Sequence, residues 1–108
     1  MSKEEIQQIS FQLIGYAGDA FSSFYNAVES AKKGEFEKAE AFLKEGEQQL
    51  TKAHQSQTEL LVAEANGDEM EFSVILVHAQ DHLMMTIMYE RIAKEFIELY
   101  RERGKNHA

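Results

Sequence analysis

Apolar side chains recur every three or four residues along most of the chain, which is the spacing of one face of an α-helix. In the first stretch, Ser2 and Glu5 have the spacing of a capping box, and the stretch ends at Lys33-Gly34. Its apolar face comprises Ile6, Ile9, Leu13, Tyr16, Ala20, Phe24, Ala27 and Ala31, widened by Phe11, Ile14, Phe21, Tyr25 and Val28. We therefore predict a first helix between the Ser2 cap and Lys33-Gly34.

Two further stretches show the same period. The second opens at Glu35, with acidic residues at its positive end, and stops at Asn66-Gly67. The third begins after a cap at either Asp68 or Ser73 and frays in residues 101–105. The face of the second comprises Phe36, Ala39, Phe42 or Leu43, Gly46, Leu50, Ala53, Gln57, Leu60 or Leu61, and Ala65.

The connections around residues 33–34 and 66–68 are short, so consecutive helices should run antiparallel. Because the chain has 108 residues and no proline, we predict one all-α domain over residues 1–108, an up-down-up three-helix bundle. Apolar side chains cover more of the third helix than two neighbouring helices can bury, so we also predict a homotrimer or another symmetric oligomer.

Polar side chains interrupt the apolar surface of the third helix at His78, Asp81 and His82. Spacings of three and four place all three on one side of that helix. The column that continues from His78 comprises Met85, Ile92 and Leu99, and the column through Asp81 comprises Val74 and Met88. We expect the first column to hold His78 in place. Burying polar groups on this surface costs free energy unless something uses or satisfies them.

Three kinds of site fit these residues. In the first, the polar side chains fix the register or the oligomeric state and do no chemistry. In the second, His78 and His82 bind a metal ion, as in the H-x-x-E-H helix of zinc peptidases, although Asp81 is one methylene shorter than the glutamate base there. In the third, a neutral imidazole takes up a phosphoryl group, and Gln80 or His82 donates hydrogen bonds to its oxygens. The residues alone do not separate the third kind from the first.

Two other features have two interpretations each. Residues 15–20 bring an unusual number of small side chains into one helix, which suits close approach of a neighbouring helix or leaves room beside a reactive group. His54 and Gln57 interrupt the apolar face of the second helix, and His54 is either a structural imidazole or a residue near a partner-docking surface.

Composition narrows the classes of function. Eleven basic and nineteen acidic residues give a net charge of -8, and no basic cluster is longer than Lys32-Lys33, which argues against a nucleic-acid partner. The absence of cysteine excludes a disulfide framework and a thiolate metal site. The start of the chain lacks an apolar signal segment, and no run of eighteen apolar residues occurs. We expect a cytoplasmic protein.

Several motifs carry a family resemblance. Residues 75–84, Ile-Leu-Val-His-Ala-Gln-Asp-His-Leu-Met, closely resemble the active-site helix of the enzyme IIA components of the bacterial phosphotransferase system, lactose/cellobiose class. Residues 16–20, 34–39 and 53–58 are similar to the family's first-helix signature, first turn and second-helix motif. Together these motifs span nearly the whole chain in the family's order.

The resemblance implies a trimer of three-helix subunits. It implies that His78 accepts a phosphoryl group at Nε2 from phospho-HPr and passes it to a cysteine of the IIB component. Asp81 matches a carboxylate that meets its symmetry mates on the trimer axis around a divalent cation, taken to be magnesium. Gln80 and His82 match positions lining the active-site cleft.

The resemblance also bears on the sugar. The sugar is bound by the membrane IIC component, and the motif around His78 is more similar to the cellobiose and diacetylchitobiose branch than to the lactose branch. We expect uptake of a β-linked disaccharide such as cellobiose. At Phe21, relatives often carry a basic residue, so any phosphate or partner contact of that residue does not carry over.

Overall fold

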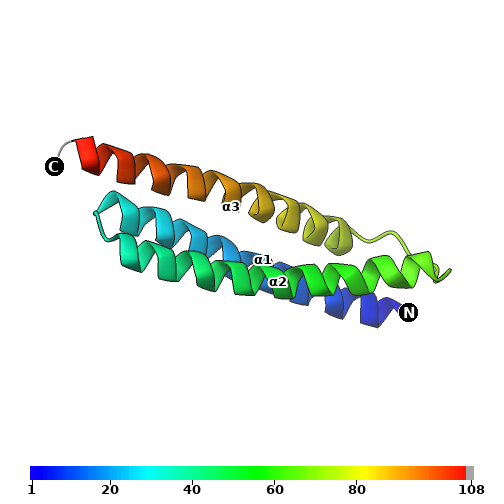
Figure 1. Cartoon of the computed structure of the whole chain (residues 1–108). Helices are drawn as coiled ribbons and strands as arrows, with labels where there is room; N and C mark the ends of the chain where they lie inside the picture. Colours follow the sequence, from blue (N-terminus) through cyan, green and yellow to red (C-terminus); the bar gives the residue numbers. More distant parts are fainter. Residues whose placement is uncertain (107–108) are drawn as a thin grey trace.

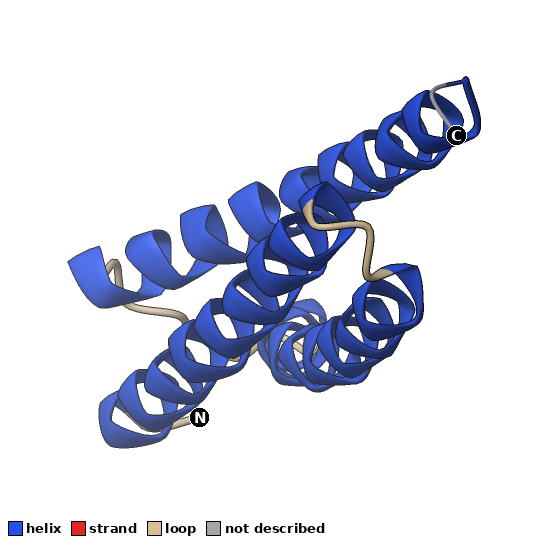
Figure 2. Ribbon diagram, turned by 90° about the vertical axis from the view of Figure 1, so that its left-hand side faces the viewer, coloured by secondary structure: helices blue, strands red, loops and turns tan. Residues whose placement is uncertain are grey.

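The computed structural model describes residues 1–106 and forms three long helices. These are α1 (Lys3–Lys32), α2 (Phe36–Ala65) and α3 (Val74–Asn106). The chain reverses at the turn after α1 and again at the connection after α2, which gives an elongated molecule of 58 × 21 × 16 Å (Figure 1). Within residues 1–106 the only elements are helices joined by two loops (Figure 2), which confirms the all-α, three-helix prediction.

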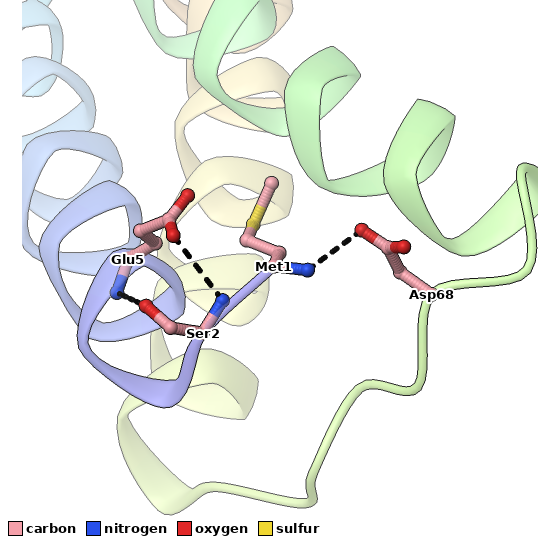
Figure 3. A network of polar contacts seen from close by, with 4 residues as sticks. All are labelled: Met1, Ser2, Glu5 and Asp68. Carbon is pink, nitrogen blue, oxygen red and sulfur yellow. Dashed lines mark hydrogen bonds and ion pairs between the residues drawn. The ribbon is translucent and has the colours of Figure 1, made fainter.

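The predicted ends of α1 and α2 are confirmed. The Ser2 hydroxyl accepts a hydrogen bond from the Glu5 N–H at 3.1 Å, and the Glu5 carboxylate accepts one from the Ser2 N–H at 3.4 Å (Figure 3). Both helices are followed by a glycine with a positive φ, +79° at Gly34 and +95° at Gly67. Glycine adopts this conformation without a steric penalty, so both positions stop a helix.

Of the two possible caps for α3, the chain uses Ser73. The Ser73 side chain accepts a hydrogen bond from the Leu76 N–H at 3.4 Å, and its carbonyl accepts one from the Val77 N–H at 3.1 Å. Asp68 instead accepts a hydrogen bond from the Met1 ammonium group at 2.8 Å (Figure 3). This bond raises the pKa of the Met1 α-amino group and holds the α2–α3 connection against the start of α1.

The predicted fraying of residues 101–105 is wrong, because α3 continues to Asn106. Arg101 lies at the point where fraying was expected. Its guanidinium group donates to the Glu40 carboxylate of α2 at 2.5 Å and lies 5.4 Å from the centre of the Phe36 ring. These contacts fasten the last turns of α3 to the start of α2.

The core forms along α1, which packs extensively on both other helices, whereas α2 and α3 make little contact with each other. Phe24 of α1 is fully buried and lies against Gly46 of α2. Between α1 and α3 the contact is close, because the Thr86 hydroxyl reaches the Ala17 carbonyl at 3.2 Å. The core comprises Leu13, Ala17, Ala20, Phe24, Ala27, Ala31, Ala39, Leu43, Leu50, Ala53, Ala79, Leu83, Ala93 and Ile97.

A second apolar face of α3 is not covered by the chain itself. Its exposed side chains are Val74, Val77, Met84, Met85, Met88, Ile92, Phe96 and Leu99. The chain has 7100 Å² of accessible surface, whereas a folded monomer of its mass has about 6,100 Å². Its radius of gyration is 16.9 Å, against about 13 Å for a compact domain of this length. Met85, Ile92 and Leu99 are exposed in the single chain, so their predicted role in holding His78 in place stays a prediction that requires cover from a further copy.

No helix within residues 1–106 is long and apolar enough to cross a membrane.

The Phe24–Gly46 contact predicts a stability change. A Cβ atom at Gly46 would lie 2.5 Å from the Phe24 ring, which is fully buried, so the ring or the helices would have to shift. We expect Gly46→Ala to lower the free energy of unfolding by about 1–3 kcal/mol.

Gly15→Ala is the matched control, because a Cβ atom there meets nothing within 4 Å. It should leave stability unchanged or raise it by up to about 1 kcal/mol, since alanine favours helix over glycine. Urea unfolding of both variants tests the contact, and equal midpoints would contradict it.

Candidate functional site

His78 lies in the second turn of α3 and is exposed. One helical turn later, the ring of His82 lies beside it, with 5.6 Å between the ring centres and an interplanar angle of 88°. The spacing of four residues brings the two rings together on one flank of the helix. Of the three polar residues predicted to share one side of the helix, the structure brings these two imidazoles together.

His82 is the more enclosed of the two histidines. Its Nδ1 atom is buried and has no hydrogen-bond partner among the described residues. The Thr86 hydroxyl lies 2.9 Å from the His82 carbonyl and 3.2 Å from the Ala17 carbonyl, which anchors this turn of α3 to α1. Hydrogen bonding to an incoming group is therefore left to Nε2, the other ring nitrogen.

Gln80 does not join the histidine pair. Its side-chain oxygen accepts a hydrogen bond from the Gln57 amide of α2 at 2.7 Å. This bond draws Gln80 to the α2 side of the helix, whereas His78 and His82 lie on another side. From the sequence, Gln57 stands out only as a polar interruption of the apolar face of α2. A polar residue at a core position was the available signal, but it did not identify the partner.

Asp81 is exposed on the uncovered apolar face of α3, between Val74 and Met88 in the same column. Within residues 1–106, no three histidine, cysteine, aspartate or glutamate side chains come together to hold a metal ion. A single exposed carboxylate would leave water as most of the oxygen ligands of a hard divalent cation. Carboxylates from further copies of the chain would give a cation at Asp81 more protein ligands.

The small residues of α1 divide into two groups. Ala17 and Ala20 are buried and allow the close approach of a neighbouring helix, as the first interpretation predicted. A Cβ atom at Gly15 or Gly18 would meet no neighbouring atom within 4 Å, so close packing within the chain does not require these glycines. For Gly15 and Gly18, the second interpretation stays a prediction: that they leave room beside a reactive group outside this chain.

Two other residues that the sequence singled out lie on α1 and α2, whereas the histidine pair lies on α3. His54 is exposed on α2. Phe21 of α1 stacks on Tyr89 of α3, with ring centres 4.4 Å apart and 25° between the planes. The sequence indicated Phe21 as a departure from its relatives but not this stacking partner.

Comparison with known proteins identifies close relatives. Residues 8–101 match the family model of the phosphotransferase system lactose/cellobiose-specific IIA subunit. The lactose-specific EIIA component of Staphylococcus aureus strain N315 is 43% identical over 101 residues, covering 94% of this chain and 98% of the relative.

Two solved structures are also similar. The cellobiose-specific enzyme IIA of Bacillus anthracis superposes with a TM-score of 0.92 at 40% identity, covering 97% of this chain and 94% of the other. The IIA(chitobiose)–HPr complex of the Escherichia coli N,N′-diacetylchitobiose branch gives a TM-score of 0.78 at 34% identity, covering 92% and 96%.

The Gln57–Gln80 hydrogen bond predicts energetic coupling between α2 and α3. Replacing either glutamine with alanine leaves its partly buried partner without a hydrogen bond, so each variant should lose about 1 kcal/mol of stability. The double variant should lose little more than either single one. Urea unfolding of the three variants measures the coupling, and additive losses would show that the two side chains do not interact.

Proposed function

The chain belongs to the lactose/cellobiose-specific IIA family of the phosphotransferase system, and we propose that His78 is the residue that carries its phosphoryl group. Members of this family are phosphotransferase components that act as phosphocarriers in sugar uptake. The observation that carries the proposal is the exposed imidazole of His78 on α3, paired with a second imidazole and within reach of a protein partner.

In the proposed reaction, Nε2 of His78 attacks the phosphorus of phospho-HPr. A new N–P bond forms while the N–P bond to the HPr histidine breaks, and the electron pair stays with that histidine. In the second step, a cysteine thiolate of the IIB component attacks the same phosphorus and releases His78. An imidazole suits both steps because it is nucleophilic when neutral and its phosphorylated form retains a high transfer potential.

We assign the main supporting role at the site to His82. Because Nδ1 of His82 is enclosed, a hydrogen on Nε2 is the one available to a phosphoryl oxygen on the neighbouring His78. Gln80 remains a proposed residue of the cleft. Its side-chain oxygen accepts a hydrogen bond from Gln57, so we expect Gln80 to act by holding α2 and α3 together.

The proposed assembly is a homotrimer joined through the uncovered apolar face of α3. That face supplies apolar surface for an interface to bury. The accessible surface by which the single chain exceeds a typical folded monomer of its mass is of the size that a subunit interface buries. Three copies of Asp81 would meet on the axis. Their mutual repulsion requires a neutralising partner, and carboxylate oxygens suit magnesium.

For the sugar, we propose a β-linked disaccharide, with cellobiose first. The relatives at 40–43% identity are named for lactose and cellobiose, and the more distant one for diacetylchitobiose. The sugar itself would be bound by the IIC permease in the membrane. The chain would receive its phosphoryl group from HPr and pass it to IIB on the cytoplasmic side.

The alternative function is a structural or metal-binding helical oligomer without phosphoryl transfer. It requires His78 to stabilise the fold or the assembly. The exposure of His78 in the single chain argues against a role in stabilising the fold of that chain, because removing an exposed side chain costs little stability.

Labelling tests the phosphocarrier directly. Incubation with phosphoenolpyruvate, enzyme I and HPr should place an acid-labile phosphoryl group on the chain, and His78→Ala should abolish it. The free energy of unfolding of His78→Ala should stay within about 0.5 kcal/mol of the parent.

His54→Ala is the matched control, because His54 is also an exposed helical histidine but lies outside the pair. It should be labelled like the parent chain. Undiminished labelling of His78→Ala would refute the assignment, and a large loss of stability without any labelling of the parent would favour the structural alternative.

The axial position of Asp81 can be tested through assembly. Asp81→Asn removes the proposed repulsion, so the variant should form a trimer at least as tight as the parent and independent of added magnesium. Sedimentation over a concentration series, with and without a chelator, measures this. Dissociation of Asp81→Asn to monomers would contradict the axial placement.

A further inference from the structure

The connection between α2 and α3 presents a large apolar side chain that no part of the chain covers. Phe72 is 84% exposed, the highest value among the large hydrophobic side chains described. Leaving a phenylalanine exposed to this extent forgoes the free energy that its burial would provide. Aromatic side chains are enriched among the residues that dominate binding at protein interfaces.

The connection around Phe72 is held at both ends. On one side, the Asp68 N–H donates to the Ala63 carbonyl at 3.0 Å. The Asp68 carboxylate also pairs with the Met1 ammonium group (Figure 3). On the other side, Ser73 caps α3 through its hydroxyl and its carbonyl. Phe72 is therefore displayed by a segment whose ends are fixed.

This segment lies at the end of the molecule that carries the proposed nucleophile. The connection leads directly into α3, and His78 follows Val74 by four residues, or about 6 Å of helical rise. A partner that brings a reactive group to His78 would therefore pass close to Phe72.

The charge around this end is mostly negative. Positive groups there are the Met1 ammonium group, which pairs with Asp68, and Lys3 at the start of α1. No lysine or arginine occurs between Lys52 and Arg91, which includes the end of α2, the connection and the first half of α3. Next to Phe72, the connection carries Asp68, Glu69 and Glu71. A phosphoryl group bears nearly two negative charges, so its transfer needs positive charge that these residues do not supply.

We propose that Phe72 is the apolar anchor of a docking surface for the phosphoryl donor, a carrier protein that presents basic side chains around an apolar patch. This inference rests on the proposed function, since it takes HPr as that donor. The acidic connection attracts the basic surface and speeds encounter, while Phe72 slows dissociation. The basic side chains of the donor also provide positive charge next to the transferring phosphoryl group, which the residues of this chain around the connection do not.

A second copy of the chain, docked through its own connection, is a less suitable occupant. Contact between identical connections would bring the same acidic residues of each copy together, and juxtaposed like charges oppose association. A basic heterologous surface has the complementary charge.

The test compares two aromatic variants in phosphoryl transfer from phospho-HPr. For Phe72→Ser we expect the half-saturating concentration of phospho-HPr to rise roughly tenfold, as for a central interface aromatic, with a smaller effect on the rate at saturation. Tyr25→Ser is the matched control. Tyr25 is also an exposed aromatic, but it lies far from His78. Thr86 follows His78 by eight residues and contacts Ala17 of α1, and Tyr25 follows Ala17 by another eight residues. That places Tyr25 about 24 Å from His78 along the helices, and its variant should behave like the parent.

A second pair of variants tests the charge. Glu69→Gln with Glu71→Gln should raise the half-saturating concentration at low salt and reduce its dependence on salt, whereas Glu37→Gln with Glu102→Gln at the far end should do neither. Circular dichroism and native mass of all variants check that the fold and the assembly are intact.

Three results would overturn the inference. Equal behaviour of Phe72→Ser and Tyr25→Ser would remove Phe72 from the docking surface. An altered native mass of Phe72→Ser would mean that Phe72 contacts a second copy, and an effect only on transfer to IIB would mean that the acceptor docks there. In each of these cases His78 would still be labelled, whereas failure of the proposed function would abolish labelling of the parent chain itself.

Discussion

The close packing of α3 on α1 determines which side chains of α3 remain available for function. The Thr86 hydroxyl reaches the Ala17 carbonyl, and Ala79 and Ala93 are completely buried in the same core. Small residues at this contact let the two helices approach and fix the rotation of α3 about its axis. With that rotation fixed, the opposite face of α3 must point away from the chain.

From this constraint the two kinds of polar residue on α3 separate. His78 lies on the flank beside His82, where an imidazole is exposed and a second ring supports it. Asp81 lies on the uncovered apolar face, among side chains that another subunit would bury. One helical turn thus serves two proposed purposes, phosphoryl transfer on one flank and assembly on the neighbouring face.

The sequence predicted those features that depend on local chemistry. The capping box at Ser2 and the glycines at positions 34 and 67 set the helix ends, and an excess of apolar positions on the third helix indicated a face without cover. Contacts between distant residues were not predictable in this way. Asp68 and Ser73 both had suitable spacing for a cap, but in the fold Asp68 pairs with the Met1 ammonium group, 67 residues away.

Gln80 shows the same limit at the candidate site. Its position next to the histidines suggested a shared cleft, but a side chain at the edge of a helix face can turn to either side. The amide of Gln57 on α2, which no local pattern of α3 reveals, supplies its partner. The continuation of α3 past residue 101 likewise depends on Glu40 and Phe36 of another helix.

Native mass measurement after incubation with phosphoenolpyruvate, enzyme I and HPr tests the central claim most directly. The claim is that copies of this 12.4 kDa chain assemble through α3 and that each copy carries one phosphoryl group on His78. It predicts the mass of three chains with three added phosphoryl groups, lost together on acid treatment. A single chain, or a trimer whose mass does not change, would contradict it.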